Sequence, residues 1–140
     1  MIEAVVLDTN VVLSGLRSRN GYAFKVLEFI SEGIIRPVIS VPLILEYETV
    51  LNHHREALGL DTSDISDFLD YICKVADKVK IYYLWRPILK DPYDDHILEV
   101  AVGSECKYIM SYNKKDFIPV GSFGIEVVTP KEYMEIRGYI

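Results

Sequence analysis

Short apolar runs alternate along this chain with longer segments in which apolar residues recur every three or four positions. The short runs are rich in β-branched residues, which is typical of the buried strands of a parallel sheet. They predict strands at residues 2–7, 36–40, 78–84, 107–111 and 125–129. The longer segments have the spacing of amphipathic helices. They predict helices at residues 22–33, 42–58, 63–78, 94–105 and 130–136. Strands that alternate with helices predict an α/β sandwich around a central, mainly parallel sheet.

The chain is expected to form one domain over residues 1–140. Half of its 140 residues are hydrophobic, and it has no internal repeat, low-complexity tract or long linker. No apolar stretch reaches the roughly 18 residues of a membrane span, and an acid stands near the start where a signal peptide has basic residues. We therefore expect a cytoplasmic protein without a membrane segment. Cys73 and Cys106 lack a metal-binding spacing, and we expect both to be reduced and buried.

Acidic side chains stand at the ends of several predicted strands. Asp8 ends the first strand, an acidic cluster at 91–95 lies between a strand and a helix, and Asn113 and Asp116 follow the strand at 107–111. The carboxyl ends of parallel strands lie at one edge of a sheet, where such folds place their sites. The pattern therefore predicts that these side chains meet at that edge.

The acidic cluster itself, "DPYDDHIL", has two readings. Asp91, Asp94 and Asp95 are close enough to repel one another, so a bound cation could neutralise them. Alternatively, Asp94 or Asp95 could cap the helix that follows, because acids accept hydrogen bonds from the free amides of a helix start. Taken alone, the cluster favours the cap.

Glu46 is a further candidate ligand because of its position on the predicted helix at 42–58. It lies along the apolar stripe, three residues after Leu43, whereas Glu48 falls on the polar side. A charged carboxylate at a core-facing edge needs a partner, which could be a basic side chain or a cation. Mg²⁺ and Mn²⁺ prefer such oxygen ligands. A cation held there could activate a water and hydrolyse phosphodiesters without a nucleophilic Ser or Cys.

The net charge of −6 argues against a broad basic surface for nucleic acid. This objection weakens if a bound metal supplies the local positive charge. A haloacid-dehalogenase-type phosphotransferase would need a second aspartate two positions after Asp8, where this chain has Asn10. A receiver-like domain would need paired acids that the sequence does not clearly offer.

Three stretches resemble the motifs of the PIN domain, a family that includes the VapC-type toxin ribonucleases. "VVLDTNVVLSGL" resembles the opening strand and D-T-N signature, with Asp8, Thr9 and Asn10. "ISVPLILEYETVL" resembles the second motif and places the family glutamate at Glu46. "DPYDDHILEVAVGSECKYIMSYNKKDF" resembles the third and fourth motifs, with Asp95 and Ser111. The resemblance implies a three-layer α/β/α fold and an endoribonuclease that uses Mg²⁺ or Mn²⁺.

The resemblance assigns the metal to Asp8, Glu46 and Asp95, and leaves the fourth ligand open. Many relatives have an aspartate where this chain has Asn113, and some relatives with asparagine there supply an acid three positions later, here Asp116. Three further side chains have supporting roles in this interpretation. Asp94 is a cap or an outer acid, and Asn10 and Ser111 orient a carboxylate or a water.

The resemblance also suggests partners. RNA would be the substrate, and four loop cations near the expected site could contact its backbone: Arg17, Arg19, Lys114 and Lys115. Toxin-like relatives form homodimers and are inhibited by a small antitoxin, so both partners are expected for this chain. The alternative is a PIN-like RNA- or protein-binding module whose metal site is impaired, which the asparagine at position 113 keeps open.

Overall fold

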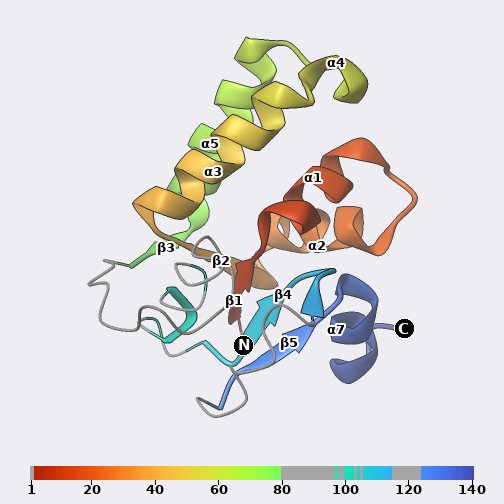
Figure 1. Cartoon of the computed structure of the whole chain (residues 1–140). Coiled ribbons are helices and arrows are strands. Elements are labelled where there is room, and N and C mark those ends of the chain that lie inside the picture. Colours follow the sequence, from red (N-terminus) through yellow and green to blue (C-terminus); the bar gives the residue numbers. More distant parts are fainter. Residues whose placement is uncertain (1, 80–96, 98–99, 103, 105, 115–123) are drawn as a thin grey trace.

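The computed structural model describes residues 2–79, 97, 100–102, 104, 106–114 and 124–140 (Figure 1). These residues form a three-layer α/β/α sandwich around a parallel sheet, as expected. The described strands are β1 (Glu3–Leu7), β2 (Ile35–Ile39), β3 (Asp77–Lys78), β4 (Tyr108–Met110) and β5 (Glu126–Val128). The described helices are α1 (Thr9–Arg17), α2 (Tyr22–Ser31), α3 (Val41–His53), α4 (Arg55–Leu58), α5 (Thr62–Val75) and α7 (Pro130–Ile136).

The sheet has the strand order β3-β2-β1-β4-β5, with every described pair parallel. Val5 and Val6 of the central strand β1 are fully buried, which explains its continuous apolar run. The chain moves outward from β1 to β2 and β3, and then returns to place β4 on the other side of β1. The carboxyl ends of β1 and β4 therefore form the switch point where open α/β sheets usually bind ligands.

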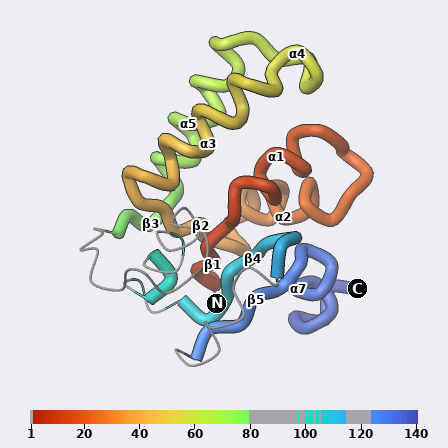
Figure 2. Tube along the Cα trace, in the orientation of Figure 1, coloured from red at the N-terminus to blue at the C-terminus, as the bar shows by residue number. Residues whose placement is uncertain are grey.

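Helices α3 and α5 pack along one another and form an arm that extends beyond the sheet, with α4 at its far end (Figure 2). Local capping explains where these helices begin. The Ser40 hydroxyl accepts a hydrogen bond from the Leu43 amide at 3.2 Å, and Asp61 and Asp64 form a capping box at the start of α5. Gly59, whose φ is 71°, ends α4 in the left-handed conformation.

Most predicted elements are confirmed where the structure describes them, with differences at three places. The helix predicted at 42–58 is two helices that meet at His54. The helix predicted at 63–78 ends at Val75, and Asp77–Lys78 forms β3 instead. Helix α1 was not predicted; Val11 and Val12 follow the polar residues at 8–10, and their β-branched side chains have a weak preference for helix. Much of the strand predicted at 78–84 and part of the helix at 94–105 lie outside the described residues.

Other expectations concern the cysteines and the membrane. Cys106 is buried and Cys73 is partly buried, and both are free thiols, so the expectation of full burial is confirmed only for Cys106. In the described part of the chain, no helix combines the length and the apolar character that a membrane span requires.

Candidate active site

Asp8 lies at the carboxyl end of β1 and is the N-cap of α1, with only 8% of its surface exposed. Its Oδ1 accepts a hydrogen bond from the Thr9 amide at 2.8 Å. Its Oδ2 accepts one from the Ser111 hydroxyl at 2.6 Å and a longer one from Asn10 Nδ2 at 3.4 Å. Hydrogen bonds to an ionised group are stronger than neutral ones. The Asp8 carboxylate is therefore held in a defined orientation by groups from two strand ends.

Glu46 reaches the same place from α3, which packs against α1. Its carboxylate accepts a hydrogen bond from the Thr9 hydroxyl. Glu46 is half-buried, whereas Glu48 is exposed, so the predicted difference between these two glutamates is confirmed. Because Thr9 directly follows Asp8, the two predicted acids share a neighbour.

Tyr47 is a site residue that the sequence analysis did not single out. Its side chain is 1% exposed, and its hydroxyl donates a hydrogen bond to the Leu7 carbonyl, one residue before Asp8. Burial raises the pKa of the Tyr47 hydroxyl well above its ordinary value, and the charges of Asp8 and Glu46 raise this pKa further. Both carboxylates therefore act on one buried hydroxyl. The only sequence signal was the position of Tyr47 on the apolar stripe, next to Glu46.

The end of β4 supplies the third part of the site. Ser111 is fully buried, and its amide donates to the Val128 carbonyl of β5 at 2.9 Å. The hydroxyl that donates to Asp8 also accepts a hydrogen bond from the Asn113 amide at 3.0 Å. The Tyr112 amide donates to Asn10 Oδ1 at 3.3 Å. These contacts bring Asp8, Asn10 and Ser111 together, as the sequence predicts, while the Asn113 side chain lies exposed beside them.

The donor set of this site fits a hard divalent cation in kind. Asp8 and Glu46 supply carboxylate oxygens, and Mg²⁺ commonly binds through one or two carboxylates together with substrate phosphate. Within the described residues, no group of three or more His, Cys, Asp or Glu side chains is gathered for a metal. Asp94, Asp95 and Asp116 lie outside the described residues, so their part in the site stays a prediction.

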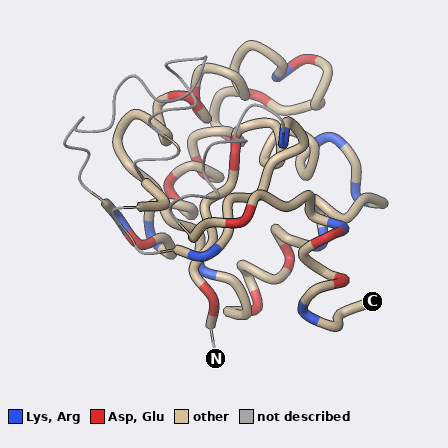
Figure 3. The backbone as a smooth tube through the Cα atoms, turned by 60° about the horizontal axis from the view of Figure 1, so that its bottom comes forward, with Lys and Arg blue, Asp and Glu red and all other residues tan. Residues whose placement is uncertain are grey.

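The predicted RNA contacts are only partly near this site. Arg17 and Arg19 are exposed at and just beyond the carboxyl end of α1, which is about 13.5 Å long and separates them from Asp8. The Lys114 ammonium lies 2.9 Å from Glu132 Oε2, and this hydrogen bond is the main reason why the pKa of Glu132 is lowered. Lys115 lies outside the described residues. Along the described chain, Lys and Arg are interspersed with Asp and Glu (Figure 3).

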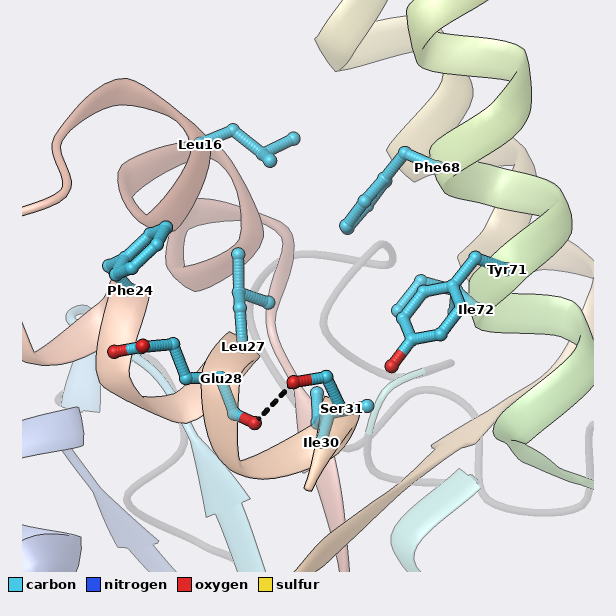
Figure 4. A pocket seen from close by; sticks show the side chains of 9 residues that line it. All are labelled: Leu16, Phe24, Leu27, Glu28, Ile30, Ser31, Phe68, Tyr71 and Ile72. Atoms are coloured by element: carbon cyan, nitrogen blue, oxygen red, sulfur yellow. Dashed lines mark hydrogen bonds between the residues drawn. The ribbon is translucent and has the colours of Figure 1, made fainter. Parts of the chain in front are cut away.

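A second feature is an apolar groove between α1 and α2 on one side and α5 on the other, with a volume of about 230 Å³ (Figure 4). Leu16 and Leu27 line one wall, and Phe68 and Tyr71 line the facing wall. Glu28 also lines the groove.

Acidic residues border this groove on the α5 side as well. Asp64 and Asp67 lie one helical turn before Phe68 and Tyr71, respectively, and both are exposed. Glu28 therefore lines the groove and two further acids lie on the neighbouring turn of α5, and the Lys25 ammonium lies 3.9 Å from the Glu28 carboxylate.

Comparisons with known proteins agree with this fold. A crystal structure of VapBC2 from Rickettsia felis, bound to a DNA fragment from their promoter, superposes with a TM-score of 0.60. That match has 14% sequence identity and covers 91% of this chain and 98% of the other. No curated protein matches this sequence. A sequence model described as the PIN domain matches residues 4–115, which include Asp8, Glu46 and Ser111. The chain belongs to the PIN domain family.

Proposed function

We propose that this protein is a divalent-metal-dependent endoribonuclease. The observation that carries the proposal is the meeting of Asp8 and Glu46 through Thr9 at the switch point of a PIN domain. Mg²⁺ or Mn²⁺ would bind to these two carboxylates. Asp95, together with Asn113 or Asp116, would complete the ligand set.

The residues around the proposed metal would orient and strengthen its binding for phosphodiester hydrolysis. A bound divalent cation would polarise the phosphate and lower the pKa of a bound water. Ser111 and the Thr9 amide orient the Asp8 carboxylate, because each donates to a different oxygen of that group. The burial of Asp8 lowers the screening by water and so strengthens its attraction for a cation.

Cleavage of RNA by the purified protein tests this proposal. Structured and single-stranded RNAs are incubated with Mn²⁺, Mg²⁺ or a chelator, and the products are resolved on denaturing gels. We expect cleavage that the chelator abolishes and that Asp8→Asn and Glu46→Gln each reduce by at least about 100-fold. Glu48→Gln is the matched control, since Glu48 is an exposed glutamate on the same helix. Absence of both cleavage and divalent-ion binding would refute the nuclease and favour the binding module.

We further propose that the protein is the toxin of a toxin–antitoxin pair. The fold shared with the VapBC2 structure supports this proposal, and so does the groove between α1–α2 and α5. An apolar groove with acids at and near its edge is complementary to an amphipathic helix with basic flanks. The proposed occupant is such a helix of a small antitoxin.

Co-expression with the product of a neighbouring reading frame tests the groove. We expect Phe68→Ala to weaken co-purification and to restore RNA cleavage in the presence of that product. Ile136→Ala is the matched control, because Ile136 is an exposed apolar residue of α7 away from the groove. Equal binding by both variants would rule out the groove. The expected homodimer is a separate prediction, which light scattering at several protein concentrations would check.

A further inference from the structure

We propose that Thr9 and Tyr47 are positioning residues that hold Asp8 and Glu46 at the spacing that a metal requires. This inference rests on the proposed metal-dependent activity. It concerns two side chains that do not themselves belong to the proposed ligand set.

The two residues form a crossed pair of hydrogen bonds between β1–α1 and α3. Thr9 follows Asp8 in the chain, and its hydroxyl donates to the Glu46 carboxylate. Tyr47 follows Glu46, and its hydroxyl donates to the carbonyl of Leu7, the residue before Asp8. Each acid is therefore adjacent in sequence to a side chain that reaches the segment carrying the other acid.

Burial makes this crossed pair a stiff connection. Thr9 is 6% exposed and Tyr47 is 1% exposed, so water has little access to either hydroxyl, although the Glu46 carboxylate that accepts from Thr9 is only half-buried. A buried hydroxyl and a buried backbone carbonyl both need partners, so breaking the hydrogen bond from Tyr47 to the Leu7 carbonyl costs free energy. The relative position of the two segments is thereby fixed at the point where the carboxylates converge.

Metal sites depend on such supporting contacts. Ligands that are displaced by a few tenths of an ångström bind their metal less well, and partners that orient ligands typically contribute about 10- to 100-fold in metal affinity.

A second buried tyrosine provides a matched control for Tyr47. Tyr133 of α7 is also 1% exposed, and its hydroxyl donates to Glu3 Oε1 at 2.8 Å. Glu3 begins β1, whereas Leu7 ends it. The two tyrosines thus hold opposite ends of β1. Tyr47 does so next to Asp8 and Glu46, whereas Tyr133 does so at the other end of the strand.

The first test compares Mn²⁺ binding by calorimetry in the wild type, Tyr47→Phe and Tyr133→Phe, with thermal unfolding recorded for each. We expect Tyr47→Phe to weaken Mn²⁺ binding by about 10-fold or more, and Tyr133→Phe to leave it unchanged. Both variants are expected to lose thermal stability, because each loses a buried hydrogen bond. Equal Mn²⁺ affinity in the two variants would overturn the role of Tyr47.

Thr9 is tested independently, so the inference remains falsifiable if Tyr47→Phe does not fold. Thr9→Val removes the hydroxyl but keeps the shape, and we expect about 10-fold weaker Mn²⁺ binding. Thr9→Ser restores the hydroxyl and should recover the affinity. If Thr9→Val binds Mn²⁺ as the wild type does, the crossed pair has no positioning role. If the wild type itself binds no Mn²⁺, the proposed function fails and this inference fails with it.

Discussion

Removal of the Ser111 hydroxyl is the most informative single change to the site. Ser111 is fully buried and joins the end of β4 to Asp8. Ser111→Ala deletes one oxygen and leaves the backbone and the packing almost unchanged. The measured effect should therefore report mainly on the hydrogen bond to the Asp8 carboxylate.

The expected loss follows from the contacts of that hydroxyl. Its 2.6 Å hydrogen bond is made to a charged, buried acceptor, and such bonds contribute about 1.5–3 kcal/mol. The second contact, from the Asn113 amide at 3.0 Å, adds little because water can replace it at this exposed residue. We therefore expect the free energy of unfolding to fall by about 1.5–3 kcal/mol. With a urea m-value of about 2 kcal/mol/M, the midpoint would fall by roughly 0.7–1.5 M.

Urea unfolding, followed by circular dichroism at neutral pH without divalent ions, measures this change. Ser66→Ala is the control, since Ser66 is an exposed serine inside α5, and its unfolding free energy should stay within about 0.5 kcal/mol of the wild type. A similarly small change for Ser111→Ala would refute the reasoning. It would mean that Asp8 gains no net stability from its contact with β4.

Three further predictions concern the scaffold. Gly15→Val should lower the free energy of unfolding by about 1–3 kcal/mol in urea, because a Cβ at Gly15 would lie 3.1 Å from the backbone carbonyl oxygen of Ala23 and 2.6 Å from Leu27 Cδ1. Wild-type stability would show that the α1–α2 contact is looser. Asp61→Ala should lower the free energy of unfolding by about 1 kcal/mol in the same assay, because it removes the N-cap of α5. An unchanged free energy of unfolding would show that the capping box does not stabilise the protein. Burial raises the pKa of the Cys106 thiol, so iodoacetamide at pH 7 should label Cys106 more slowly than Cys73 in the folded protein. Unfolding in urea should remove this difference, and rapid labelling of Cys106 in the folded protein would contradict its burial.

Local patterns were sufficient for most of the fold. The apolar run that forms β1 and the capping box that begins α7 both depend on near neighbours in the chain. Helix α1 is different, because its start is capped locally by Asp8, whereas Val11 and Val12 have a weak preference for helix and are fully buried against other elements. Tertiary packing outweighs the weak intrinsic preference of these residues.

The residues of the candidate site also fall into two groups, those that the sequence indicated and those that only the structure revealed. The sequence indicated Asp8 by its place at a strand end and Glu46 by its place on a helix face, and the resemblance to the PIN motifs added Ser111. The sequence indicated Thr9 only as the middle residue of the D-T-N motif and Tyr47 only as part of an apolar stripe, and it assigned no role to either side chain. Their contacts span 37 and 40 positions of the chain, respectively.

The sequence by itself determined the alternation of strands and helices, the family motifs and the acids at the strand ends. These features follow from side-chain periodicity and local hydrogen bonding, which act over a few residues. Only the tertiary structure decided which groups orient those acids. The hydrogen bond from Ser111 to Asp8 joins residues 103 positions apart. Such a contact exists only because parallel pairing sets the ends of β1 and β4 side by side.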